Sequence, residues 1–186
     1  MKIFFDTEFT GLHKDTTLVS LGMVSEDGRM FYAELMDFDE SQCDKWIMDN
    51  VVENLIAKGN DELAEKLGTI NNTTVIIGGK KDVKKELYKW ISGFDDVQLV
   101  SDVCHYDMVL FIDLFGTAFN LPENVNASCH DINQDIARHY NISEKAAFDK
   151  SREEIVKELC GNEIEGCKHN SLYDAMVIKA IYEEIK

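Results

Sequence analysis

The sequence predicts a mixed α/β fold, in which one β-sheet is flanked by helices in a single domain over residues 1–186. Strand-like runs come first, strand-like and helix-like segments then alternate, and the last third of the chain has helical periodicity. This order is typical of a sheet with helices packed on it. With 45% apolar residues, a chain of 186 residues can bury one core.

The first strands are predicted near the N-terminus. Lys2–Asp6 is a short, largely apolar run, which is typical of a central strand buried on both faces. Leu18–Ser25 and Arg29–Leu35 are two further β-rich runs. Asp27-Gly28 lies between them, and this dipeptide predicts a hairpin.

The middle of the chain has a different character. Asp39–Leu67 is acidic and lacks strand-like alternation, so we expect two or three helices with a break at Gly59-Asn60. Thr73–Ile77 fits either a short strand or an extended connector. A helix is predicted over Asp82–Ile91, where apolar residues form one stripe.

The remaining elements follow in order. Val97–Ser101 is a strand candidate, and the helix His105–Phe115 should end at Gly116. The last third predicts three helices, over Ile132–Tyr140, Ser143–Leu159 and Ser171–Ile185.

The charge balance excludes some functions. Aspartate and glutamate total 35 against 19 lysines and arginines, a formal net charge of -16. This argues against a non-specific duplex binder, which relies on basic residues, but not against an enzyme that meets nucleic acid through metal ions. No apolar run approaches the roughly 20 residues of a membrane span, and the N-terminus lacks a signal-peptide pattern. We therefore expect a cytoplasmic protein without membrane association.

The five cysteines include no C-x-x-C pair, and we expect them to be reduced. One alternative is a zinc site built from Cys160, Cys167 and His169 with Cys129 or His130. The spacing of these residues fits no common zinc ribbon.

Acidic residues follow two predicted strands. Asp6 and Glu8 are two apart on an extended chain, so both carboxylates can face one metal site. Taken alone, this pattern in so acidic a chain favours a solvated turn at the end of the strand. Asp107 lies in the first turn of a predicted helix, where an acid also complements the helix dipole. Asp102 follows the strand more closely and competes for the same assignment.

A third group of polar residues precedes the last helix. His169 and Asp174 are five residues apart and could reach one cleft from the loop and the first helical turn. An ordinary capping box, with Ser171 as the N-cap and Asp174 three residues later, is the alternative explanation.

In this order, the three motifs resemble the DEDD superfamily of 3'-5' exonucleases, in its histidine-containing branch. The residues that carry the resemblance are Phe4–Leu12 (FFDTEFTGL), Tyr106–Phe111 (YDMVLF), and His169 five residues before Asp174. The small bacterial and phage exoribonucleases of the RNase AS group are the most similar.

The resemblance implies a ribonuclease H-like sheet and a two-metal-ion mechanism. Two divalent ions, Mg²⁺ or Mn²⁺, would be held by the carboxylates of Asp6, Glu8, Asp107 and Asp174. His169 would be the general base that takes a proton from the attacking water.

The resemblance also implies the substrate, which is the 3' end of a single-stranded nucleic acid, with RNA favoured. Leu12 resembles the residue that wedges against terminal bases in relatives, and Phe9, Tyr106 and Thr7 are the other candidates for substrate contact. Core packing is the alternative for Leu12, Phe9 and Tyr106. Relatives are commonly dimers, so a homodimer is expected.

One basic cluster remains, at Lys80, Lys81, Lys84, Lys85 and Lys89. It fits a solvated helix face, or a strip that steers an incoming phosphate backbone.

Three rival functions stay open beside exoribonuclease activity. The enzyme could act on single-stranded DNA or very short oligonucleotides, because nothing in the sequence distinguishes ribose from deoxyribose. The chain could be a non-catalytic binding module, although the filled catalytic positions argue against this. The zinc site would use His169 as a structural ligand.

Overall fold

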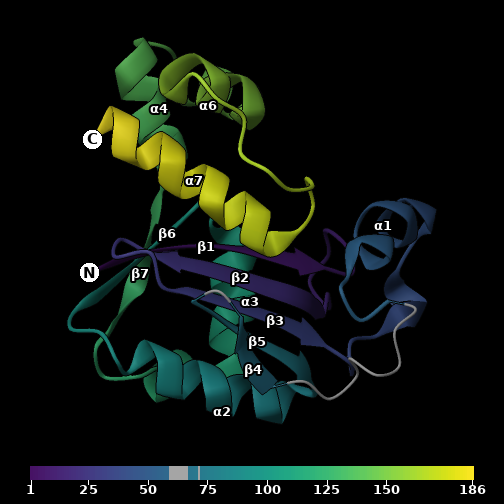
Figure 1. Cartoon of the computed structure of the whole chain (residues 1–186). Coiled ribbons are helices and arrows are strands. Elements are labelled where there is room, and N and C mark those ends of the chain that lie inside the picture. The colour runs from purple at the N-terminus through teal and green to yellow at the C-terminus, as the bar shows by residue number, and fades with distance from the viewer. Residues whose placement is uncertain (59–66, 71) are drawn as a thin grey trace.

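The computed structural model describes residues 1–58, 67–70 and 72–186. In these residues, seven strands form one mixed sheet in the order β4-β5-β3-β2-β1-β6-β7, and helices cover both of its faces (Figure 1). The strands are β1 (Lys2–Phe9), β2 (Leu18–Ser25), β3 (Met30–Leu35), β4 (Leu67–Ile70), β5 (Thr73–Gly78), β6 (Val97–Ser101) and β7 (Val125–Asp131). The helices are α1 (Lys45–Asn50), α2 (Lys80–Ile91), α3 (His105–Phe115), α4 (Ile132–Tyr140), α5 (Glu144–Phe148), α6 (Arg152–Cys160) and α7 (Ser171–Ile185).

Strand β1 lies in the interior of the sheet, antiparallel to β2 and parallel to β6. Its side chains alternate between two cores because successive residues of a strand point to opposite faces. Ile3 and Phe5 pack with α2 and α3, whereas Phe4 packs with α4, α6 and α7, and all three are fully buried. The same alternation places Asp6 and Glu8 on the α7 face of the sheet.

The predicted fold class is confirmed, and so are the strands near the N-terminus. β2 and β3 form the expected hairpin, whose turn is closed by the bond from the Gly28 amide to the Ser25 carbonyl at 3.0 Å. The segment Thr73–Ile77, left open between a strand and a connector, belongs to β5 and pairs in parallel with β3.

Two strands were not predicted. β7 is an edge strand whose central residues, Asn126, Ala127 and Ser128, are exposed, so its sequence lacks an apolar alternation. β4 begins at Leu67, inside the stretch expected to be helical, and pairs antiparallel with β5.

The helical predictions were partly wrong. In residues 39–58, the described part of the acidic stretch before Leu67, the helical elements are the six-residue α1 and two short 3₁₀ turns, Glu40–Gln42 and Val52–Asn54. The expected break at Gly59-Asn60 lies outside the described residues. Ser143–Leu159 is two helices, α5 and α6, instead of one. The second begins because the Ser151 hydroxyl accepts a hydrogen bond from the Glu154 amide and caps a new N-terminus.

Helix α7 crosses the sheet in backbone contact with β2. A Cβ atom built on Gly22 would lie 2.2 Å from the Leu172 nitrogen and from the Ser171 carbonyl carbon, so only glycine permits this approach. The buried hydroxyls of Ser20 and Ser171 are hydrogen-bonded at 2.9 Å beside it. Gly22 pairs with Asp6 in the sheet, so the contact fixes the start of α7 near the acidic end of β1.

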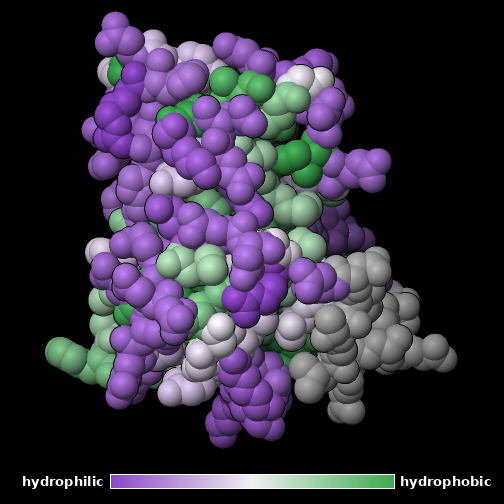
Figure 2. Space-filling model, turned by 60° about the vertical axis from the view of Figure 1, so that its left-hand side comes forward, coloured by the Kyte–Doolittle hydropathy of each residue, from purple (hydrophilic) through white to green (hydrophobic). Residues whose placement is uncertain are grey.

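Polar side chains cover most of the face shown in Figure 2, and apolar side chains are visible between them. Among the described residues, no helix combines the length and the apolar character that crossing a bilayer requires.

Candidate active site

Asp107 is held against the edge of β1. Pairing between β1 and β6 extends only to Phe4 and Val100, which leaves the later amides of β1 without a strand partner on that side. The Thr7 amide donates to the Asp107 carboxylate at 3.2 Å, and the Thr7 hydroxyl donates at 2.5 Å. Ser101 donates a third hydrogen bond, and Asp107 is buried. The Thr7 hydroxyl is thus already hydrogen-bonded to Asp107, and its contact with substrate stays a prediction.

The competing residue, Asp102, is tied to another part of the molecule. Its carboxylate accepts from the Arg152 guanidinium at 2.6 and 2.9 Å and from the Asn133 amide at 2.8 Å. Arg152 has no free donor to share, because its remaining hydrogen bonds go to Asn133 and to two backbone carbonyls. The structure therefore favours Asp107 over Asp102 as the partner of Asp6.

The loop before α7 places the histidine motif beside the strand acids. Asn170, one residue earlier than the expected Ser171, is the N-cap, and its side chain accepts from the Leu172 and Tyr173 amides. His169 has a left-handed backbone with φ of 63°, and its amide donates to the Asp174 carboxylate at 2.9 Å. This bond joins the loop to the first turn of α7.

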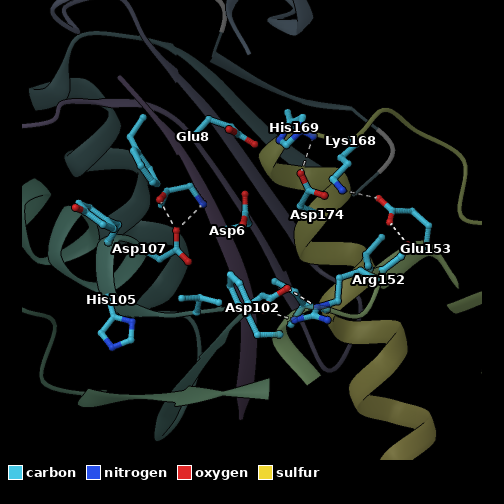
Figure 3. Close-up of a pocket in the computed structure, with 18 of the residues that line it drawn as sticks. Asp6, Glu8, Asp102, His105, Asp107, Arg152, Glu153, Lys168, His169 and Asp174 are labelled. Atoms are coloured by element: carbon cyan, nitrogen blue, oxygen red, sulfur yellow. Dashed lines mark hydrogen bonds and ion pairs between the residues drawn. The ribbon is translucent and has the colours of Figure 1, made fainter. Parts of the chain in front are cut away.

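The predicted acids converge on one cavity. Glu8, His169 and Asp174 each offer a ligand atom, and these atoms lie within 4.8 Å of one another. Figure 3 shows Asp6 between this group and Asp107, whereas the ring of His105 lies on the far side of Asp107. All five predicted catalytic residues line a cavity of about 570 Å³.

The zinc alternative is wrong for this fold. Within residues 1–58, 67–70 and 72–186, the only cluster suited to a metal contains Glu8, His169 and Asp174 and includes no cysteine. The imidazole of His169 faces the carboxylates, and all five cysteines are free thiols.

Burial raises the pKa of all four carboxylates, and repulsion within the cluster adds to the effect at Asp6 and Glu8. Burial raises the pKa of Glu8 to about 8, with repulsion from Asp174 and Asp107 adding to it. Burial raises the pKa of Asp174 to about 7, and that of Asp107 only to about 6 because Ser101 and Thr7 stabilise its charge. The pKa of Asp6 is raised well above its usual range by burial and by the surrounding acids.

This donor set fits hard divalent cations. Four carboxylates, none of which forms an ion pair with a lysine or arginine of the described residues, carry the negative charge and the oxygen ligands that Mg²⁺ and Mn²⁺ prefer. Burial is the main cause of their raised pKa values, and bound cations would stabilise the charged forms that burial disfavours. The four residues are Asp6, Glu8, Asp107 and Asp174.

A first prediction concerns pH and metal. Because the pKa values of Glu8 and Asp174 in the folded chain exceed their ordinary 4.5 and 3.8, the native state binds these protons more tightly than the unfolded state. Without metal, this contribution to stability is complete below about pH 4 and is lost as the pH rises towards 8. Manganese at a hundredfold excess over its dissociation constant should restore about 2.7 kcal/mol.

Differential scanning fluorimetry in EDTA and in manganese across this pH range checks the prediction. Glu8→Gln should flatten the decline in melting temperature without metal, because glutamine does not titrate. If millimolar manganese leaves the melting temperature at pH 8 unchanged, the proposed metal site is contradicted.

The predicted substrate residues surround the same cavity. Phe9 and Tyr106 stack on each other, with ring centroids 5.2 Å apart and an interplanar angle of 20°, and both also pack against the core. Leu12 is 79% exposed at the rim, so core packing does not explain it. These three positions fit a surface for bases, and the contact itself stays a prediction.

The lysine cluster lies on α2, away from the α7 face. Lys80 pairs with Asp113 of α3, and Lys85 and Lys89 both pair with Glu86. These ion pairs favour the solvated helix face over a steering strip.

Sequence reasoning missed several residues around the cavity. Arg152, Glu153 and Lys168 line it from α6 and the loop before α7, and Trp46 approaches His169 from α1. Charged residues on a helix and a lone tryptophan in an acidic segment have no spacing that marks a site. Only the tertiary structure identifies them.

Comparison with known proteins agrees with this geometry. A 3'-5' exoribonuclease from Mycobacterium tuberculosis, Rv2179c, is 26% identical over 136 residues, which are 72% of this chain and 73% of that protein. The nuclease domain of 3'hExo, a DEDDh family member solved with bound rAMP, matches with a TM-score of 0.68 and 12% identity, over 97% of this chain and 88% of that one. S. pombe Pop2p, solved with Mg²⁺ and Mn²⁺, matches with a TM-score of 0.58 and 16% identity, over 99% and 82%.

The structural neighbours establish the fold, and the family is decided by the sequence model. The model of the 3'-5' exoribonuclease Rv2179c-like domain matches residues 1–186. The enzyme class expected from the three motifs is thereby confirmed. The chain belongs to the Rv2179c-like family of 3'-5' exoribonucleases.

Proposed function

We propose that this enzyme removes nucleotides from the 3' end of single-stranded RNA with two Mg²⁺ or Mn²⁺ ions bound by Asp6, Glu8, Asp107 and Asp174. The observation that carries the proposal is the convergence of these four acids with His169 on one cavity. When bound, the ions supply Lewis-acid stabilisation of the charge that develops on the phosphate. The metals bound by S. pombe Pop2p support this choice of ions.

His169 is the general base in this proposal. Its ring lies at the cavity beside Glu8 and Asp174. Burial, with the charge of Lys168, lowers the pKa of His169 from its ordinary 6.5, so the imidazole is neutral and able to accept a proton at physiological pH. The backbone bond from His169 to Asp174 holds the base and an acid of the cluster in one unit.

In this proposal, the enzyme binds its substrate mainly through contacts with the bases. Phe9 and Tyr106 offer aromatic surface and Leu12 an exposed aliphatic wedge, which suits unpaired bases because stacking needs no complementary charge. A chain of net charge -16 gains little from phosphate contacts. The rAMP in the 3'hExo structure supports a ribonucleotide as product. A homodimer, implied by the resemblance, remains part of the proposal without a surface assigned to it.

Single-stranded DNA and short oligonucleotides are the alternative substrates, and a time course separates them. Single-stranded RNA and DNA of the same sequence, labelled at either end, are incubated with manganese and wild type, Asp174→Asn or Glu184→Gln. We expect RNA to shorten from its 3' end, DNA to react more slowly, and Asp174→Asn to be inactive.

Glu184→Gln is the matched control, because it makes the same change of charge at an exposed position of the same helix. It should behave as wild type. Cleavage of neither polymer by wild type would contradict the proposal and favour dinucleotide-sized substrates or a non-catalytic module.

A further inference from the structure

Trp46 contacts the imidazole of His169 from a separate part of the fold. The two ring centroids lie 4.9 Å apart at an interplanar angle of 77°, an edge-to-face arrangement that aromatic rings favour. Trp46 belongs to α1, more than a hundred residues before His169 in the chain. Its side chain is 51% exposed, so burial in a core does not account for its position.

The segment that carries Trp46 is fastened to the loop after β1. The Gln42 side chain accepts from the Thr10 hydroxyl at 2.5 Å and donates to the Asp15 carbonyl at 3.0 Å. Asp44 then caps α1 by accepting from the Ile47 amide at 2.8 Å. Trp46 is therefore presented from an anchored turn.

Further along, the same segment is fastened to the sheet. The buried Glu34 carboxylate accepts from the Ile56 and Ala57 amides at 2.5 and 2.9 Å and from the Tyr32 hydroxyl at 2.7 Å. Segments on both sides of α1 are thus tied to the loop after β1 and to β3, and β1 itself lines the cavity.

The imidazole of His169 needs such a contact. In the part of the chain that the structure describes, its backbone is held by the bond to Asp174, but the ring itself takes part in no hydrogen bond. The left-handed φ of 63° sets where the side chain leaves the backbone, and rotation about its own bonds is not fixed by this. The Trp46 ring packs edge-to-face with the imidazole and so restricts this rotation.

We infer that Trp46 is a positioning residue for hydrolysis, holding the His169 imidazole towards Glu8 and Asp174. This rests on the proposed function, in which His169 is the base. Loss of orientation of a catalytic group can cost up to about 100-fold in rate. Trp46→Ala should therefore lower kcat by about 10-fold to 100-fold with little change in KM, and Trp46→Phe should recover most of the loss because phenylalanine keeps an aromatic ring there.

Two readouts test the inference. First, the His169 ring resonance in proton NMR, assigned by its loss in His169→Asn, should be displaced by the tryptophan ring current in wild type and move in Trp46→Ala. Second, a double-mutant cycle measures activity on single-stranded RNA. If Trp46 acts through His169, Trp46→Ala costs nothing further in the His169→Asn background.

Tyr88→Ala is the matched control, since Tyr88 is 48% exposed on α2. It should leave both the resonance and kcat unchanged. If Trp46→Ala raises KM, and still does so in the His169→Asn background, the inference is overturned and Trp46 is a contact surface for the substrate. Wild-type kcat in Trp46→Ala would also overturn it.

Failure of the proposed function has a different signature. If wild type degrades no RNA, the proposed reaction is wrong and so is a positioning role in it, whatever the resonance shows. If wild type is active and the effects of Trp46→Ala and His169→Asn on activity simply add, the exoribonuclease proposal stands and the inference about Trp46 fails.

Discussion

Asp6→Asn is expected to lower exonuclease activity by several orders of magnitude and to stabilise the metal-free protein at the same time. Burial raises the pKa of Asp6, and repulsion from Asp107, Glu8 and Asp174 raises it further. The amide removes a proposed metal ligand, and it also removes the charge that the other acids repel. Single-turnover degradation of labelled RNA measures the first effect, and the melting temperature in EDTA at pH 8 measures the second.

The expected fall in activity and the expected rise in melting temperature have opposite signs, which makes the prediction specific. A mutation that merely damaged the fold would lower activity and melting temperature together. Asp95→Asn, the same substitution at an exposed position, should change neither. Near-wild-type activity of Asp6→Asn would refute the metal assignment, and a lower melting temperature in EDTA would refute the electrostatic account.

Arg152→Met is expected to destabilise the protein by about 3–5 kcal/mol, because it leaves a partly buried carboxylate unpaired. The side chains of Arg152 and Asp102 are only 14% and 21% exposed, and their closest atoms are 2.6 Å apart. Asp102 would keep only the hydrogen bond from Asn133. Chemical denaturation in saturating EDTA measures the free energy of unfolding without a contribution from metal binding.

Arg138→Met is the matched control, because Arg138 pairs with Asp135 but is 66% exposed. We expect it to cost less than about 1 kcal/mol, as surface ion pairs do. Adding Asp102→Asn to Arg152→Met should recover part of the loss, since the unpaired charge is then gone. Equal losses for the two arginine variants would show that the burial of the Asp102 pair has no special importance.

Local signals in the sequence predicted the elements that carry most of the site. The alternation of β1 determines that Asp6 and Glu8 share the face of Phe4, and this alternation is visible in the sequence. The hairpin follows from Asp27-Gly28 in the same way. Strand pairing and turn chemistry of this kind depend on neighbours in the chain.

The remaining features depend on contacts between distant residues. Asp102 and Asp107 are equally plausible in sequence, and the choice follows from where Arg152 and the edge of β1 lie. The contact of Trp46 with His169 joins segments with no local pattern in common. β7 was missed because an exposed edge strand has no need of apolar alternation.

The close approach of α7 to Gly22 also affects when the proposed active site assembles during translation. Asp6 and Glu8 leave the ribosome early, whereas His169 and Asp174 are synthesised more than 150 residues later. Until α7 docks on β2, a nascent chain holds at most part of the proposed metal site and lacks the proposed base. We therefore expect exoribonuclease activity to appear only after α7 has been synthesised and has packed on the sheet.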